Sequence, residues 1–417
     1  MKVLHTSDWH LGRVFHGASL LAEQQQALAR VVDVAADAGV DVVVVSGDLY
    51  DRAIPPADAV DLLADVLGAL RATGAQVVAI TGNHDSPNRV GAFDALLRAG
   101  GVTLRGRFDP SAPVVVPATD GGPDLVVHPV PYLEPLAAAR GDDGARPTQH
   151  RVVADALDAV RADLAARGPA RSVVVAHAFV AGAAPSDSER ELTVGGVDRV
   201  PESVFDGITY AALGHLHRAQ ELSARVAYSG SILPYSFSET GSPSVRVVDL
   251  RPDGSVASEV VDLGAGRGVA TVRGRLDDLL TDPSHTAAEG RWVRVQLTDE
   301  VVPRLAMDRL RDRFPHAVVL EHDSPRAAGT DDDLRRRAAG EPVAPVDLAR
   351  AFLADRLGRP VDAAEAGHLH DAFAAVEAAR RELGDVVVDV AADPSVEEAP
   401  PSGADGPADG DDVGAVA

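Results

Sequence analysis

The stretch Asp41–Asp51, DVVVVSGDLYD, is the clearest indication of the fold of this chain. Its β-branched run Val42–Ser46 predicts a fully buried strand, which ends directly in the polar pair Gly47-Asp48. Apolar residues at helical spacing on either side predict helices over 20–38 and 57–73. A buried strand between two helices, with a carboxylate at its carboxyl end, is typical of a sheet that presents a functional site at that edge.

The same pattern recurs along the first half of the chain. Further β-branched runs predict buried strands that each end at a polar cluster, at 3–6, 77–81, 172–176 and 209–213. Shorter strand-like runs follow at 225–229, 245–250 and 256–262. The alternation of strands and helices predicts an α/β fold in which the polar clusters share one edge.

Five polar clusters carry the chemistry of the sequence. They are Asp8-Trp9-His10, Gly47-Asp48-Leu49-Tyr50-Asp51, Gly82-Asn83-His84-Asp85, His177 and Gly214-His215-Leu216-His217. Each is weak evidence alone, since a single histidine after a strand is typical of a hydrogen-bonded structural residue. Together they offer the carboxylate, imidazole and amide ligands that suit Mn²⁺, Fe²⁺ or Zn²⁺. The chain has no cysteine, which excludes a thiolate zinc site and a cysteine nucleophile.

Such a ligand mixture serves phosphoryl chemistry. Two divalent ions that share a bridging carboxylate, roughly 3.5–4 Å apart, can activate a water and neutralise the charge of a phosphate. The glycines before Asp48, Asn83 and His215 would let the chain turn sharply and approach the ions closely. We interpret His5 and His128, which lie inside predicted strands, as structural residues.

The order of the five clusters resembles the signature of the calcineurin-like metallophosphoesterases. Three longer stretches, HTSDWHLGRVFHG (5–17), RELTVGGVDRVP (190–201) and YSGSILPYSFSE (228–239), resemble the bacterial DNA-repair nuclease branch of that superfamily. The resemblance is specific over 1–262 and mainly one of layout beyond. It implies a β-sandwich flanked by helices, with a small α/β cap domain and C-terminal helices.

The resemblance also implies a role for each polar residue. Asp8, His10 and His217 would bind a first ion, and Asp48 would bridge it to a second ion held by Asn83, His177 and His215. His84 would be the catalytic histidine, with Asp85 as the group that orients it by a hydrogen bond. The two ions are expected to be Mn²⁺, although Fe²⁺ and Zn²⁺ share these ligands. Arg13, His16 and Arg89 are candidate substrate-binding residues.

The chain divides into five predicted segments. They are a metallophosphoesterase domain at 1–263, a small α/β cap domain at 264–322, a linker at 323–345, a helical docking element at 346–390 and an acidic, disordered tail at 391–417. Within the cap domain we expect strands at 292–297 and 317–320 with a helix at 301–314 between them. The docking element is expected to hold helices at 346–357 and 363–383.

The resemblance implies DNA as the substrate, with exonuclease activity on duplex ends and endonuclease activity on single strands and hairpins. It also implies an SMC-like coiled-coil ATPase as the partner of the C-terminal helices, and a homodimer within a heterotetramer. The net charge of −24 argues against a chain that coats nucleic acid by itself, so we expect weak DNA affinity without the ATPase. No long apolar run or secretory signal is evident, which predicts a cytoplasmic, nucleoid-associated protein without a membrane span.

Two other functions fit the same residues. The metal ligands would equally serve a phosphoesterase that acts on cyclic nucleotides or phosphoproteins, although such an enzyme would not need the segments beyond residue 262. A mainly architectural subunit that tethers DNA ends is the third candidate. The complete set of ligand positions argues against a purely architectural role.

Overall fold

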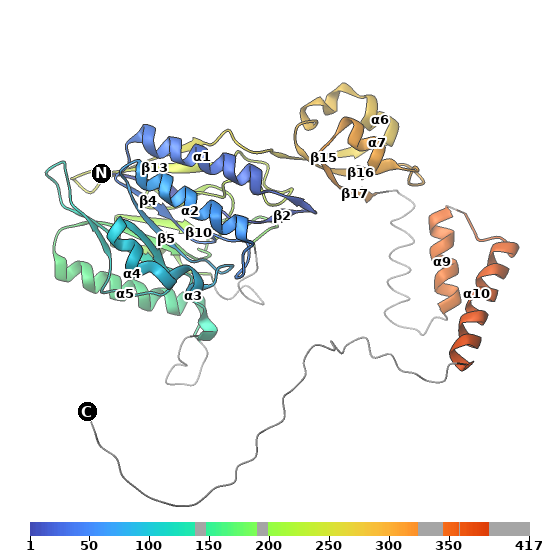
Figure 1. Ribbon diagram of the computed structural model, residues 1–417, viewed down its shortest axis with the longest axis horizontal. Coiled ribbons are helices and arrows are strands. Elements are labelled where there is room, and N and C mark those ends of the chain that lie inside the picture. Colours follow the sequence, from blue (N-terminus) through green and yellow to red (C-terminus); the bar gives the residue numbers. More distant parts are fainter. Residues whose placement is uncertain (138–146, 190–198, 324–344, 358, 383–417) are drawn as a thin grey trace, which may run out of the picture. The chain divides into compact units, whose positions relative to one another are not determined.

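The computed structural model describes residues 1–137, 147–189, 199–323, 345–357 and 359–382 (Figure 1). The chain forms two compact units, 1–328 and 329–417. The predicted tail at 391–417, and the predicted linker apart from its first and last residues, lie outside the described residues.

Two six-stranded mixed sheets form the larger part of the first unit. The first sheet has the order β14-β13-β1-β4-β5-β6. Its strands are β1 (Lys2–Thr6), β4 (Val42–Val45), β5 (Gln76–Ile80), β6 (Val102–Arg105), β13 (Ser244–Leu250) and β14 (Val256–Asp262). The run β1-β4-β5-β6 is parallel, whereas β13 pairs antiparallel with both β1 and β14.

The second sheet has the order β11-β12-β10-β9-β8-β7. Its strands are β7 (Val114–Val116), β8 (Leu125–Val130), β9 (Arg171–His177), β10 (Tyr210–Gly214), β11 (Gln220–Ser223) and β12 (Val226–Tyr228). The four central strands, β12, β10, β9 and β8, are parallel. The edge strands β11 and β7 are antiparallel to their neighbours.

The two sheets pack face to face, which explains the run of four valines in β4. Val42 and Val44 belong to the core between the sheets, whereas Val43 and Val45 belong to the core beneath helices α1 (Leu21–Ala38) and α2 (Ala57–Ala72). Helix α5 (Gln149–Arg167) covers the outer face of the second sheet, as Figure 1 shows. The predicted β-sandwich flanked by helices is confirmed.

Shorter elements complete this part of the unit. They are the hairpin β2 (Val14–Phe15) and β3 (Ala18–Ser19), and the one-turn helices α3 (Pro87–Val90) and α4 (Asp94–Leu97). Two histidines predicted to be structural are buried and hydrogen-bonded. His5 lies 3.0 Å from the hydroxyl of Tyr210, and Nε2 of His128 lies 2.9 Å from the carboxylate of Asp163.

A small parallel sheet follows in the same unit. Its strands β15 (Val269–Gly274), β16 (Trp292–Leu297) and β17 (Ala317–His322) carry helices α6 (Leu276–Thr281) and α7 (Ala306–Arg313) over a core of their own. The predicted helix at 301–314 was wrong in its start. Leu305 has a left-handed backbone (φ 53°), which cannot be part of a right-handed helix. Helix α7 therefore begins at Ala306 and not at the predicted residue 301. Strand β15 and the short helix α6 were not predicted.

The second unit holds helices α9 (Pro345–Leu357) and α10 (Ala363–Glu382), close to the predicted bounds. A reciprocal capping box starts α10: the N–H of Glu365 donates to the carboxylate of Asp362, and the N–H of Asp362 donates to the carboxylate of Glu365, both at 2.9 Å. In the described part of the chain, none of the helices has the length and apolar character that crossing a bilayer requires.

Candidate metal centre

The predicted ligands gather where the carboxyl ends of parallel strands from both sheets meet. Within the first sheet, the N–H of Asp8 donates to the carbonyl of Gly47 at 3.1 Å, and the N–H of His10 to that of Asp48 at 2.9 Å. Across the sheets, the N–H of His215 donates to the carboxylate of Asp8 at 3.1 Å. The five clusters, which lie far apart in the sequence, therefore form one buried site.

The backbone is strained at this site. Among the described residues, six that are not glycine have a positive φ, and four of these are predicted ligands: Asp8 (52°), His10 (45°), Asp48 (49°) and His215 (99°). Such conformations cost free energy and persist only where the surrounding structure enforces them, which is typical of functional sites.

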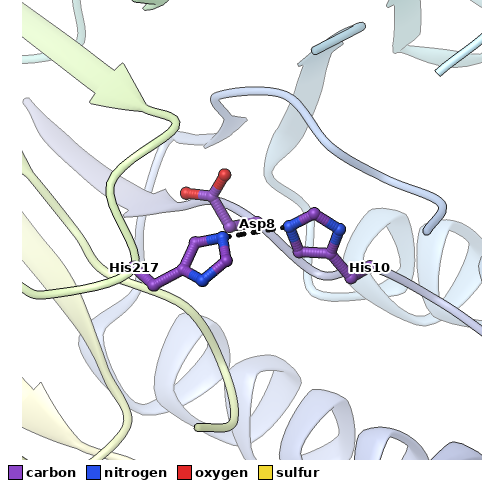
Figure 2. Close-up of side chains that lie close together, drawn as sticks. All are labelled: Asp8, His10 and His217. Carbon is purple, nitrogen blue, oxygen red and sulfur yellow. Dashed lines mark hydrogen bonds between the residues drawn. The ribbon is translucent and has the colours of Figure 1, made fainter. Parts of the chain in front are cut away.

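Asp8, His10 and His217 form the first group (Figure 2). Their ligand atoms lie within 4.8 Å of one another, and all three residues are buried. The two imidazole rings point toward one another, with 3.1 Å between their Nε2 atoms. Two ring nitrogens and a carboxylate that converge in this way are a suitable ligand set for a divalent transition metal.

Asp48 connects this group to the second one. Its Oδ2 lies 3.5 Å from Nε2 of His10 and also 3.5 Å from Nε2 of His177. On the far side, Oδ1 of Asn83 lies 2.9 Å from the same nitrogen of His177, and the ring of His215 lies 5.3 Å from the His177 ring. The carboxylate of Asp48 thus has the position that a bridging ligand requires.

Two glycines make this close approach possible. A Cβ on Gly47, whose φ is +95°, would lie 2.3 Å from Nδ1 of His177. A Cβ on Gly82 would lie 2.1 Å from Oδ1 of Asp48. Any larger residue at either position would displace a predicted ligand, as the sequence indicated.

The electrostatics of the site fit bound cations. Burial, together with neighbouring cationic groups, lowers the pKa of His10 and of His215 well below the ordinary value, so both rings stay neutral and keep a lone pair for a metal. Burial, with the charges of Asp85 and Asp8, raises the pKa of Asp48 well above its ordinary value. Divalent ions would remove this repulsion between buried carboxylates, so the residues present fit the predicted metals.

His84 lies beside both groups. Its N–H donates to Oδ1 of Asp48 at 2.9 Å, its Nδ1 lies 2.8 Å from the carbonyl oxygen of Asp51, and its ring packs edge-on against His10. We expected Asp85 to orient His84. The Asp85 carboxylate accepts from the N–H groups of Leu49, Tyr50 and Gly82 at 2.9–3.0 Å, and so joins two ligand loops. Its role in orienting His84 stays a prediction, beside the contact that the Asp51 carbonyl makes with the His84 ring.

The sequence did not predict the surroundings of His217. Its Nδ1 lies 2.7 Å from the hydroxyl of Ser188 and 3.3 Å from Oε1 of the buried Glu239, and its N–H donates to Glu189 at 2.9 Å. Burial disfavours the charged forms of His217 and Glu239, but the hydrogen bond and the opposite charges of this pair outweigh the effect of burial. The pKa of His217 is raised, and that of Glu239 is lowered to about 2. Glu239 is the last residue of the family-like stretch 228–239. Its place in that stretch was the only feature of the sequence that could have indicated a role for it.

A polar cleft of about 440 Å³ adjoins the first group. Arg13, His16 and Ser188 line one part of it, and Arg294 and Glu321 of the small sheet line another. Tyr235 connects the cleft to the site, because its ring packs against both His10 and His217. Two of the three candidate substrate-binding residues, Arg13 and His16, therefore share this cleft.

Arg89, the third candidate, lies elsewhere. It is exposed on α3 and lines an apolar groove of about 600 Å³ between α2 and α4. The structure does not bring it into the cleft of Arg13 and His16.

The family model of the calcineurin-like phosphoesterases matches residues 1–219. The chain therefore belongs to this family, as the sandwich and the buried Asp and His ligands indicate. The SbcD subunit of the nuclease SbcCD from Bacillus subtilis (strain 168) is 33% identical to the chain over an alignment of 334 residues, and the match covers 76% of this chain and 84% of that protein. Within the calcineurin-like phosphoesterases, the chain thus belongs to the family of this nuclease subunit and is a phosphodiester hydrolase.

Two solved structures that match the chain have lower sequence identity. The crystal structure of TT1561 from Thermus thermophilus is 16% identical and covers 63% of this chain and 98% of its own, with a TM-score of 0.38. GAP50 of Plasmodium is 10% identical and covers 63% of this chain and 85% of its own, with a TM-score of 0.40.

Proposed function

We propose that the chain is the nuclease subunit of a DNA-repair complex and hydrolyses DNA phosphodiesters at two divalent ions, for which Mn²⁺ is the first choice. The position of Asp48 carries this proposal, because one carboxylate oxygen lies equally far from a histidine of each ligand group. The family membership supports a nuclease. We further propose exonuclease action on duplex ends and endonuclease action on single strands and hairpins.

In this proposal Asp8, His10 and His217 hold one ion, Asn83, His177 and His215 hold the other, and Asp48 bridges them. When bound, two such ions supply an activated water and neutralise the charge of the scissile phosphate. His84 donates its Nδ1–H to the Asp51 carbonyl, and in its imidazolium form its Nε2–H would donate a hydrogen bond to the phosphate or give its proton to the leaving oxygen. The cleft that Arg13 and His16 line admits the strand.

We propose that the small domain, predicted at 264–322, acts as a cap over this cleft. Arg294 and Glu321 from its sheet line the cleft together with residues of the sandwich. The two parts are also fastened together, since Arg267 forms an ion pair with the buried Glu23 of α1. A cap that shares a wall with the cleft would restrict which DNA ends reach the metals.

We propose the helical segment as the docking site for an SMC-like coiled-coil ATPase. Helices α9 and α10 belong to a compact unit separate from the sandwich. They expose apolar side chains, with Leu357 at 40% and Val376 at 53% of full exposure. Exposed apolar residues on a helix pair suit the groove-and-helix contacts by which partner helices bind.

We propose that the chain pairs as a homodimer through the apolar groove between α2 and α4. Ile54 (66% exposed), Phe93 (64%) and Leu97 (37%) present large apolar side chains in this groove. Contiguous apolar surface of this kind is typical of protein interfaces. Residues of α2, α3 and α4 line it.

A nuclease assay on purified protein tests the proposal. Short duplex and hairpin DNA are incubated with Mn²⁺, with and without the ATPase subunit, beside the His84→Ala variant and a cyclic nucleotide. The proposal predicts metal-dependent DNA cleavage that the variant lacks. Turnover of the cyclic nucleotide without DNA cleavage, even with the partner, would instead indicate a small-molecule phosphodiesterase. DNA tethering without any hydrolysis would indicate an architectural subunit.

A further inference from the structure

The Nε2 atom of His217 faces His10, and the opposite ring nitrogen, Nδ1, faces a serine and a buried carboxylate. The hydroxyl of Ser188 contacts both Nδ1 of His217, at 2.7 Å, and the carboxylate oxygen Oε1 of Glu239. The same carboxylate accepts from the hydroxyl of Ser186 and, through Oε2, from the N–H of Tyr235, both at 2.8 Å. Glu239 is buried, and all these partners are donors, so the carboxylate is held ionised and in one orientation.

The protons in this chain of contacts have only one consistent arrangement. A carboxylate accepts hydrogen bonds and cannot donate them, so the single proton of the Ser188 hydroxyl goes to Glu239. The oxygen of Ser188 can then only accept from His217. The proton of the imidazole must therefore sit on Nδ1, which leaves the lone pair on Nε2, the atom that faces His10.

Two of the other ligand histidines, His177 and His10, lack such an arrangement. Nδ1 of His177 pairs with a neutral group, the carbonyl of Ser46, at 2.8 Å. Nδ1 of His10 lies 3.7 Å from the carboxylate of Asp51, beyond hydrogen-bond distance. Among these three, only His217 has a carboxylate within hydrogen-bond distance of its Nδ1.

We propose that Glu239 is a positioning residue of the first metal site: through Ser188 it fixes His217 in the Nδ1–H tautomer and makes Nε2 a stronger metal ligand. A carboxylate behind a histidine raises the basicity of the ligating nitrogen and fixes its ring. The Asp8 carboxylate lies close to both groups, so it does not separate the two sites. Glu239 adds a negative charge behind the first site only, whereas Nδ1 of His177 in the second group faces a neutral carbonyl. The first site therefore binds its ion more tightly. This inference rests on the proposed ligand assignment.

Calorimetric titration of the metal-free full chain with Mn²⁺ tests it. We compare Glu239→Gln with the control Glu221→Gln, which removes a carboxylate that pairs with Arg246 away from the site. The Glu239→Gln side chain keeps the size of the carboxylate but no longer obliges Ser188 to donate to it. We expect the tighter of two Mn²⁺ affinities to fall about 10- to 100-fold, with the weaker affinity and the control unchanged.

Thermal unfolding in EDTA separates this effect from a general loss of structure. If Glu239→Gln does not fold, the same Mn²⁺ titration is made with Ser188→Ala, which removes only a hydroxyl. We expect it to weaken the same affinity about 3- to 10-fold. Wild-type affinities in folded Glu239→Gln, or in Ser188→Ala where Glu239→Gln does not fold, would overturn the role of Glu239. A wild-type chain that binds no Mn²⁺ would overturn the proposed metal site itself.

Discussion

Replacing Gly47 by alanine tests whether the backbone of the β4 loop determines the position of a metal ligand. Gly47 has a φ of +95°, and an added Cβ would lie 2.3 Å from Nδ1 and 2.8 Å from Cγ of His177. Ordinary contacts need more than 3.4 Å, so the imidazole must move by about 1 Å. The His177 ring is held at Nδ1 by the carbonyl of Ser46 and at Nε2 by Oδ1 of Asn83. A shift of this size would therefore break both contacts.

Two costs are expected, and a matched control separates them. A left-handed backbone costs a non-glycine residue roughly 1–2 kcal/mol. Gly74 has nearly the same φ, +97°, but nothing within 4 Å of the position of an added Cβ. Gly74→Ala should therefore lose only about 1–2 kcal/mol of stability, while Gly47→Ala should also lose its metal geometry. A misplacement of about 1 Å can lower the rate about 100-fold.

The assay is hydrolysis of bis-p-nitrophenyl phosphate, a small chromogenic phosphodiester, with Mn²⁺, together with thermal unfolding of the metal-free chain. We expect Gly47→Ala to lose about 100-fold in rate or more and Gly74→Ala to keep the wild-type rate. Equal rates for Gly47→Ala and the wild type would show that the displaced His177 ring is not needed for hydrolysis. Equal losses in both variants would show that backbone strain, and not the displaced ligand, is responsible.

Three further predictions follow from the site and the fold. His84→Ala should lower DNA cleavage about 10²- to 10⁴-fold while Mn²⁺ binding and partner binding stay intact; loss of metal binding would make His84 a ligand instead. Deletion from Val346 onward should abolish ATPase binding and leave phosphodiester hydrolysis unchanged, and tight binding by the shortened chain would contradict the docking proposal. Burial lowers the pKa of His5 to about 3, so the unfolded chain takes up a proton below about pH 6.5 that the native state does not bind. Stability in EDTA should fall as the pH drops from 6.5 toward 3, and His5→Gln should flatten this slope in urea unfolding; an unchanged slope would contradict it.

Much of the fold could be predicted from the sequence, because each buried strand is a continuous β-branched run. Val42–Val45 are apolar on both faces since one face packs between the sheets and the other beneath the helices. The polar clusters that end these runs indicated the ligand site, because parallel strands bring their carboxyl ends to one edge. The roles of the individual ligands stay predictions.

Other features depend on contacts that no local pattern records. Glu239 and Ser188 reach His217 from 22 and 29 residues away, and neither lies at a fixed spacing from a ligand. The start of α7 depends on the left-handed Leu305, although apolar residues at helical spacing continue before it. Asp85 follows His84 directly in sequence, yet its carboxylate turns to the backbone of another loop.

Metal stoichiometry tests whether Asp48, which lies between the two ligand groups, bridges two ions. Metal-free protein is titrated with Mn²⁺ and the bound ions are counted by metal analysis, for the wild type and for Asp48→Asn. The account predicts two ions per wild-type chain, and at most one, weakly bound, in the variant. A single ion in the wild type, or two ions held equally well by Asp48→Asn, would contradict it.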